Sequence, residues 1–211
     1  MTLQANCEYR FHAIDAGITV TDGIAEVFGT EMANQVLYTF VSCHCAISTY
    51  HGCKLEINGA FEFNYTGSES NINLSYLNLA FALHQQERAT VLVLGSRYSG
   101  KTTLVKRLAN YTVKRGNVPF IVDLDIGKGG VTVPGTLSAM PLETPLDPCC
   151  GTCMSFSHTT SKAESMPIVY YYGYSEMKQH ADLYDSLLVN LKESIDEYDH
   201  CLLYTSPSPR D

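Results

Sequence analysis

The sequence has 211 residues, of which 45% are hydrophobic and 17% charged, a composition typical of folded globular proteins rather than disordered ones. The formal net charge of -8 excludes a general nucleic-acid coat protein, because such a protein needs a basic surface to displace counterions from phosphates. No run approaches 18 consecutive apolar residues, and the N-terminus lacks the basic start and apolar stretch of a secretory signal. We therefore expect no membrane segment and an intracellular location.

Short runs that alternate apolar and polar residues fill the first third of the chain. They include YRFHAI, GITVTDG, VLYTFV, KLEING and FEFNY within residues 7–66, and Gly, Asn and Asp separate them. Period-2 runs at such spacing indicate short antiparallel strands joined by tight turns. We predict a β-sandwich or small barrel as an N-terminal domain over residues 1–72.

The chain has eight cysteines. In a reducing compartment they act as small buried hydrophobes, so we expect no disulfide framework. Three of them lie close to two histidines in sequence, and two more form a CxxC: Cys43, Cys45, Cys53, His44, His51, Cys150 and Cys153. A structural zinc site usually needs two regularly spaced ligand pairs, and only the CxxC has that spacing, so zinc is not expected.

A helical pattern follows in residues 73–90. Its apolar positions are spaced for one side of a helix, with Leu74, Leu77, Ala80, Phe81 and His84 in that set. We interpret this stretch as a connecting helix.

Residues 91–94, VLVL, form a continuous apolar run that is typical of a strand buried on both faces of a parallel sheet. The run leads into GSRYSGKT, a full match to the phosphate-binding P-loop pattern GxxxxGK[ST]. Glycines let successive N–H groups point inward, and the following helix directs its positive end to the same place. The predicted nucleotide contacts are Gly95, Tyr98, Ser99, Gly100, Lys101, Thr102 and Thr103. The alternative, a purely structural glycine turn, is less compatible with the flanking strand and helix.

The helix after this loop is predicted over residues 101–115 and closed by Gly116. It carries the one basic cluster of the chain, made of Lys106, Arg107, Lys114 and Arg115. We favour a solvated helix face over an RNA contact for this cluster.

A second buried strand, FIVDL, spans residues 120–124. Asp125 follows it and lies nearest the edge where α/β sheets bind ligands, so we expect it to act as general base or metal-side carboxylate. Asp123, two residues earlier, is given a supporting role. The alternative is that a strand-end aspartate caps the next turn.

The remaining residues predict a long loop over 141–165, a third strand in MPIVYYYGY and a helix over SEMKQHADLYDSLLVNLKESIDEY. In that helix Leu183, Leu187, Leu188 and Leu191 are expected to face inward. The fold class is therefore α/β, with an N-terminal β-sandwich followed by a P-loop domain that has a parallel sheet. This P-loop domain covers 91–200 and is expected to be incomplete, because three strands and two helices cannot cover both faces of a nucleotide-binding sheet.

Residues 201–211, CLLYTSPSPRD, differ sharply from the acidic amphipathic stretch before them. Codon for codon they read like one frame of a transposase adapter used in sequencing libraries. We set them aside as a non-native artefact and expect the natural reading frame to continue beyond His200.

Several strings together resemble one family, the Clp-type polyribonucleotide 5'-hydroxyl kinase subunit of the messenger RNA cleavage and polyadenylation complex. They are CEYRF, GIAEVFGTE, YHGCKLEING, YLN, GSRYSGKTTL, VDLDIGKGGVTVPGT and, more faintly, PIVYYYGY. The resemblance covers nearly all of residues 7–200 and is far more specific than the P-loop alone.

The resemblance implies an ATP site with Mg²⁺ and a nuclear protein that acts on an RNA 5' end beside other cleavage subunits, including a Pcf-type scaffold. Glu8 and His44 match positions that grip the adenine. Lys101 and Asp125 match catalytic positions, with Asp125 activating the RNA hydroxyl, and Thr102 and Asp125 are the expected metal-side residues.

Two departures bear on these roles. The family usually has Gln where this chain has Lys128, and a basic residue where it has His44. The lid arginines and RNA-clamping residues of the family lie beyond the end of this chain, so we predict that it binds nucleotide but phosphorylates RNA poorly. An ATP-bound scaffold without catalysis is the alternative function, and a GTPase is disfavoured because no NKxD-like string is present.

Overall fold

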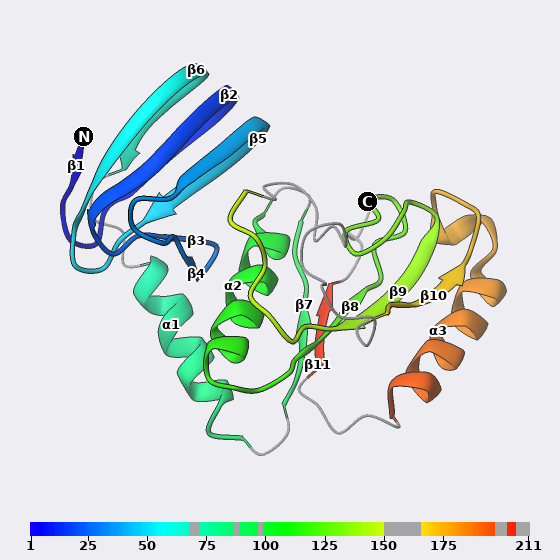
Figure 1. Cartoon of the computed structure of the whole chain (residues 1–211). Helices are drawn as coiled ribbons and strands as arrows, with labels where there is room; N and C mark the ends of the chain where they lie inside the picture. The colour runs from blue at the N-terminus through cyan, green and yellow to red at the C-terminus, as the bar shows by residue number, and fades with distance from the viewer. Residues whose placement is uncertain (68–71, 87–88, 97–98, 150–165, 197–201, 206–211) are drawn as a thin grey trace. The chain divides into compact units, whose positions relative to one another are not determined.

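A computed structural model describes residues 1–67, 72–86, 89–96, 99–149, 166–196 and 202–205. The chain divides into two compact units, and each is described separately (Figure 1). The first unit holds Met1–Phe81 and the described residues from Leu146 to Cys149. The second holds Ala82–Pro145 and the described residues from Met166 onward.

The first unit is built on an antiparallel sheet with the strand order β1-β6-β2-β5-β3-β4. Its strands are β1 (Thr2–Leu3), β2 (Glu8–Gly23), β3 (Glu26–Val27), β4 (Thr30–Glu31), β5 (Leu37–Ser48) and β6 (Cys53–Gly67). The predicted antiparallel pairing is confirmed, but three of these strands are long, so several of the short runs are not separate strands joined by tight turns. Runs such as YRFHAI and GITVTDG belong to one continuous strand.

β-bulges explain why the long strands look like short runs in the sequence. In β2 the inward residues before the bulge are Tyr9, Phe11 and Ala13, and after it Ala16 and Ile18. The register shift between Ala13 and Asp15 inserts an extra residue, which keeps the same face of the strand buried while the strand bends. The alternation of buried and exposed residues is thus interrupted in the sequence, although the buried face of the strand is continuous in the structure.

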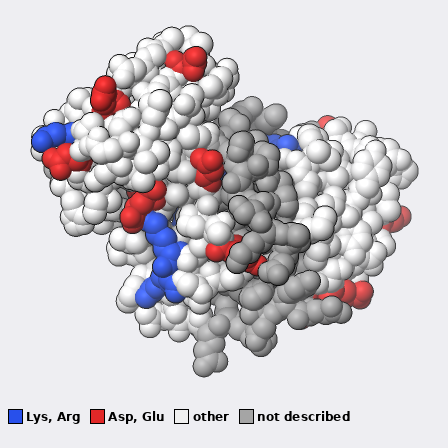
Figure 2. All heavy atoms as spheres, viewed as in Figure 1, with Lys and Arg blue, Asp and Glu red and all other residues white. Residues whose placement is uncertain are grey.

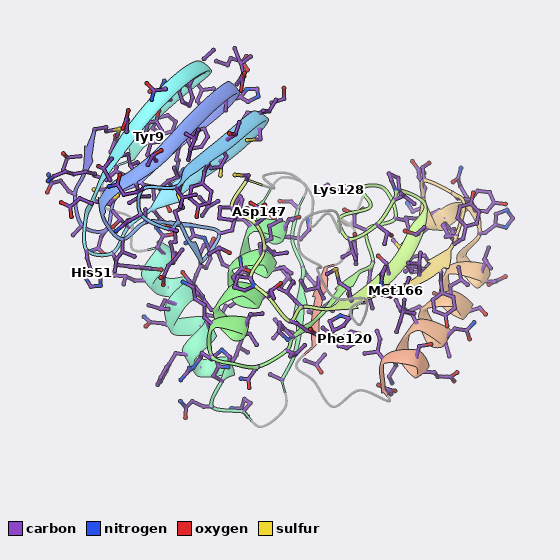
Figure 3. All side chains as sticks on the ribbon, in the orientation of Figure 1. Tyr9, His51, Phe120, Lys128, Asp147 and Met166 are labelled. Carbon is purple, nitrogen blue, oxygen red and sulfur yellow. The ribbon has the colours of Figure 1, made fainter. Side chains whose placement is uncertain are left out.

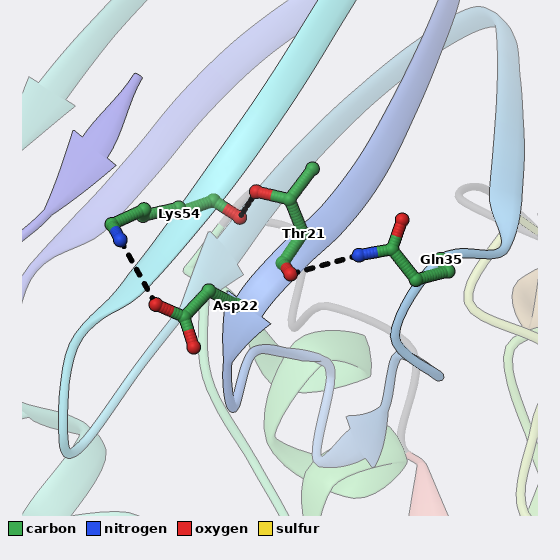
Figure 4. A network of polar contacts seen from close by, with 4 residues as sticks. All are labelled: Thr21, Asp22, Gln35 and Lys54. Carbon is green, nitrogen blue, oxygen red and sulfur yellow. Dashed lines mark hydrogen bonds and ion pairs between the residues drawn. The ribbon is translucent and has the colours of Figure 1, made fainter.

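One end of this sheet carries a polar network at the surface (Figure 4). Thr21 Oγ1 donates to the carbonyl of Lys54 at 3.2 Å, and Gln35 Nε2 donates to the carbonyl of Thr21 at 2.9 Å. Lys54 Nζ pairs with Asp22 Oδ2 at 3.0 Å, but both side chains are more than 60% exposed. Water therefore screens this ion pair, and we expect it to add little stability.

Helix α1 (Ile72–Leu83) is the predicted connecting helix, but it ends earlier than residue 90. Most of the apolar residues that the sequence places on one side of this helix are exposed. Leu74, Leu77 and Phe81 are 37%, 40% and 56% exposed, and Ala80 is the buried apolar residue. The sequence pattern fails here because apolar side chains surround most of the helix, so their spacing does not define one face.

The second unit contains a five-stranded sheet with the order β10-β9-β8-β11-β7. Its strands are β7 (Thr90–Val93), β8 (Phe120–Asp123), β9 (Thr136–Pro141), β10 (Ile168–Tyr171) and β11 (Leu202–Thr205). β11 runs parallel to both β7 and β8, which confirms the parallel sheet at its centre. β9 and β10 add an antiparallel edge. β10 was predicted, whereas β9 was not.

β11 lies within residues 201–211, the segment set aside as non-native. Its backbone pairs with β7 and β8 at Leu202–Thr205. Backbone pairing carries no information about the origin of a segment, so the adapter origin stays a prediction.

Helix α2 (Lys101–Lys114) follows the glycine loop, as predicted, and Gly116 adopts the expected positive φ of +84° just past its end. The solvated face predicted for the basic cluster is wrong for half of its members. Lys106 and Arg107 are each 3% exposed, whereas Lys114 and Arg115 are exposed. Protein covers α2 on several sides, because every residue from Val105 to Val113 is buried.

A short 3₁₀ turn, η1 (Met177–Gln179), precedes helix α3 (Ala181–Asp196), so the predicted single helix begins later than expected. Its buried residues are Tyr184, Leu191 and Ile195, with Leu187 and Leu188 partly buried. Leu183 was predicted inward but is 41% exposed. The buried side of α3 follows helical spacing through positions 184, 187, 188, 191 and 195. Tyr184, and not Leu183, is therefore the inward residue in the first turn.

Candidate nucleotide-binding site

The glycine loop runs from the end of β7 to the start of α2. The Ser99 side chain approaches Gly95 so closely that a Cβ added at residue 95 would lie 2.7 Å from Ser99 Oγ. Gly100 caps α2 with φ of +87°, which favours glycine, and no side chain caps the helix. The first turn of α2 holds no acidic residue, so its N–H groups and positive dipole end suit an anion.

Lys101 places its ammonium inside this loop. Nζ donates to the carbonyls of Gly95 at 2.8 Å and Ser96 at 2.9 Å, and the residue is only 8% exposed. Thr102 and Thr103 follow in the first turn and are half-buried. The loop therefore presents backbone donors and one cation to the same small volume.

Asp125 lies at the same edge of the sheet as the loop. β7 and β8 both run parallel to β11, which lies between them. Val93 of β7 and Asp123 of β8 both pair with Thr205 of β11. Gly95 and Asp125 each come two residues later. Because one strand separates β7 from β8, the two sites are about 10 Å apart across the sheet. A triphosphate with its metal ion has the size to bridge such a gap.

Asp123 organises the backbone around Asp125. It is 3% exposed, and its Oδ1 accepts from the N–H of Asp125 at 3.0 Å. Its Oδ2 accepts from the N–H of Gly130 at 2.5 Å and of Val131 at 3.3 Å. The supporting role predicted for Asp123 is thus a structural one. Asp123 therefore has the alternative role considered above, that of an aspartate at a strand end that binds the following turn. Asp125 is half-exposed, and its carboxylate accepts one longer hydrogen bond, from Gly127 N at 3.3 Å.

The loop after β8 depends on one glycine. At Gly129, φ is +60°, and a Cβ would lie 2.3 Å from the backbone at Val133 and Pro134. Lys128, where the family usually has Gln, lies exposed in this loop (Figure 3). The loop geometry therefore requires glycine at residue 129 but places no such demand on residue 128.

Tyr184 joins the site from α3, and sequence reasoning missed it. Its hydroxyl donates to the carbonyl of Leu124 at 3.2 Å. Burial, followed by the negative charges of Asp123 and Asp125, raises the pKa of Tyr184 to about 12. The helical spacing of residues 184, 191 and 195 is the signal that could have found it.

The two predicted adenine contacts belong to the first unit. Glu8 is 5% exposed and accepts from Arg10 Nε at 2.9 Å, and this bond raises the pKa of the Arg10 guanidinium. His44 is exposed and stacks on His12, with ring centroids 3.9 Å apart. Glu8 pairs with Ser48 and His12 with His44, so Glu8 and His44 share one face but lie roughly 13 Å apart along the strands.

The structure also bears on metal binding. Among the described residues, no group of three or more His, Cys, Asp or Glu side chains could hold a metal ion. Strand alternation puts Cys43 and Cys45 inside and His44 outside, and burial raises the pKa of the Cys43 thiol, which disfavours a thiolate ligand. The CxxC and Tyr98 fall outside the described residues.

Acidic side chains are dispersed over the visible face, and basic ones form one strip at the lower left with others well apart from it (Figure 2). This agrees with the overall negative charge. No helix in the described part of the chain has the length and apolar character needed to cross a membrane.

Comparison with known proteins places this geometry in a family. Residues 95–202 match the profile described as the P-loop of mRNA cleavage and polyadenylation factor CLP1, and residues 2–90 match the N-terminal β-sandwich domain of polyadenylation factor. The second match agrees with the predicted sandwich, and the first implies nucleotide binding.

Curated relatives include the mRNA cleavage and polyadenylation factor clp1 of Botryotinia fuckeliana, 36% identical over 90% of this chain and 43% of its own length. The CLP1 homologue of Anopheles gambiae is 36% identical over 91% of this chain and 46% of its own. The chain thus spans less than half the length of these relatives.

Among solved structures, wild-type Clp1p in complex with Pcf11p superposes with a TM-score of 0.86 at 24% identity, over 99% of this chain and 54% of that one. A second structure of Clp1p with Pcf11p, reported as the structural basis for ATP loss in a glycine-to-arginine point mutant, superposes with a TM-score of 0.87 at 22% identity. The match covers 99% of this chain and 54% of that one. These likenesses show the fold. The two profile matches establish that the chain belongs to the Clp1 family of mRNA cleavage and polyadenylation factors.

Proposed function

We propose that the chain binds MgATP in the glycine loop and is the nucleotide-binding part of a nuclear subunit that acts in mRNA 3'-end cleavage and polyadenylation. The observation that carries the proposal is the arrangement of Lys101 inside the loop with Asp125 at the same sheet edge. The loop suits a phosphate group because the first turn of α2 holds no acidic residue and the Lys101 ammonium lies within the loop.

Each residue has a role in this proposal. Lys101 and the first N–H groups of α2 neutralise the β- and γ-phosphates. Thr102 and Asp125 hold the Mg²⁺ side, and the metal screens the phosphate charge. Glu8 and His44 contact the adenine, as the family resemblance implies.

The reaction proposed for the full-length protein is transfer of the γ-phosphoryl group of ATP to an RNA 5'-hydroxyl. Asp125 accepts the proton of that hydroxyl while Lys101 stabilises the charge on the transferred group. The proposed partners are an RNA 5' end and a Pcf-type scaffold subunit. Support for the scaffold comes from the solved Clp1p complex with Pcf11p.

The direct test is calorimetric titration of the purified chain with MgATP, and with MgGTP as the matched control. We expect saturable binding of MgATP with one site and much weaker binding of MgGTP, because no guanine-reading string is present. Absence of MgATP binding at millimolar nucleotide would contradict the proposal.

The alternative function is an ATP-bound scaffold, favoured by the half-exposed, lightly held carboxylate of Asp125. Substitution of Asp125→Asn in the full-length protein separates the two functions. A kinase should lose end-labelling of RNA by at least about a hundredfold and keep ATP, because the general base is absent. Unchanged complex assembly with no end-labelling in the unsubstituted protein would support the scaffold instead.

A further inference from the structure

Both polar atoms of a single peptide group, the one that joins Leu124 to Asp125, are held by side chains. The carbonyl of Leu124 accepts from the hydroxyl of Tyr184 at 3.2 Å, and also from the N–H of Ile126 at 3.2 Å. The N–H of Asp125 donates to Asp123 Oδ1 at 3.0 Å. One side chain comes from α3 and the other from β8, so the peptide plane is held from opposite directions.

The orientation of this plane controls where the Asp125 carboxylate points. A peptide group is rigid, so fixing it limits rotation to φ of Asp125 on one side and ψ of Leu124 on the other. The Asp125 side chain is itself only lightly held, by a 3.3 Å bond from Gly127 N. Its direction therefore depends more on the backbone before it than on partners of the carboxylate.

Tyr184 is well placed to hold the plane because it is itself fixed. It is 7% exposed, and its ring meets Tyr172 edge-on, with centroids 5.7 Å apart and planes at 86°. Tyr172 is 2% exposed, and its hydroxyl accepts from His180 N at 3.1 Å just before α3. The start of α3 is thereby tied to the residue after β10, and Tyr184 joins α3 to the residue after β8.

We propose that Tyr184 is a positioning residue that orients Asp125 toward the metal side of the nucleotide site. The inference rests on the proposed function, since it assigns Tyr184 a part in binding the magnesium form of the nucleotide. It predicts that α3 supports the site although it lies outside the P-loop motif.

The test compares Tyr184→Phe with Tyr170→Phe. Phenylalanine keeps the ring and its contact with Tyr172, and removes only the hydroxyl. Tyr170 is a matched control, because its hydroxyl also joins the sheet to α3, through Ser194 Oγ at 2.9 Å, but not at Asp125. ATP affinity is measured by calorimetry for each chain in excess Mg²⁺ and in excess EDTA, and thermal unfolding verifies the fold of both variants.

We expect Tyr184→Phe to reduce the gain in ATP affinity from Mg²⁺ by roughly fivefold, the worth of one hydrogen bond, with the EDTA affinity unchanged. Tyr170→Phe should match the unsubstituted chain in both conditions. Equal losses with Mg²⁺ and with EDTA would mean that the hydroxyl is only structural, and no loss would mean that it is irrelevant. Either result overturns the inference while the proposed function stands. If the unsubstituted chain binds no ATP in either condition, the proposed function fails and the inference with it.

Discussion

Replacing Lys101 with methionine is expected to lower the affinity of the chain for MgATP by roughly a hundredfold, because charged hydrogen bonds to phosphate are lost. Methionine keeps the length and apolar stem of lysine, and Lys101 is only 8% exposed, so the packing of α2 should be preserved. Nζ already lies within the loop, held by the carbonyls of Gly95 and Ser96. Calorimetric titration of both chains with MgATP measures the effect.

Lys114→Met is the matched control, since Lys114 lies exposed in the last turn of the same helix. It should leave MgATP affinity within about twofold of the unsubstituted value, because a distant exposed charge is screened by salt. Similar losses for both variants would show that overall charge, and not the ammonium in the loop, determines nucleotide affinity.

Asp123→Asn is expected to lower the free energy of unfolding of the second unit by about 2–4 kcal/mol. The carboxylate accepts three N–H groups, from Asp125, Gly130 and Val131. An amide offers one accepting oxygen, and its NH₂ group would face N–H donors that it cannot satisfy. Urea unfolding followed by circular dichroism measures the loss, and MgATP affinity should fall with it because the loop that carries Asp125 loosens.

Asp22→Asn provides the comparison at an exposed carboxylate. The ammonium of Lys54 lowers the pKa of Asp22 through a hydrogen bond and its charge, but both groups face solvent (Figure 4). We expect no measurable change in the urea midpoint for this variant. If Asp123→Asn also leaves the urea midpoint unchanged, the hydrogen bonds from the three N–H groups to the carboxylate do not stabilise the second unit. The role given to Asp123 in the loop after β8 would then be wrong.

The glycine loop and α2 were predictable because their signals are local. The motif, the apolar strand before it and Gly116 after it define the start and end of α2 to within one residue. The order of strand, loop and helix also placed Asp125 at the correct edge of the sheet. Backbone geometry at glycine and short-range helical spacing are encoded by neighbouring residues, so no distant contact was needed.

The long strands of the first unit and β9 were missed for a different reason. A bulge changes the alternation within β2, and only pairing with β5 and β6 shows that the strand continues. The sequence analysis predicted no element over residues 136–140, and the antiparallel pairing of β9 with β8 is a contact between residues far apart in the sequence. Burial of Lys106 and Arg107 likewise depends on the elements that cover α2.

The sequence by itself determined the family resemblance, the order of the two units and the residues of the P-loop, because these depend on short strings of neighbouring residues. Only the tertiary structure decided that Asp123 organises the loop after β8 and that Tyr184 holds the peptide before Asp125. The physical reason for the second is that the hydrogen bond from Tyr184 in α3 to Leu124, just after β8, joins residues 60 positions apart, and no local pattern encodes such a contact.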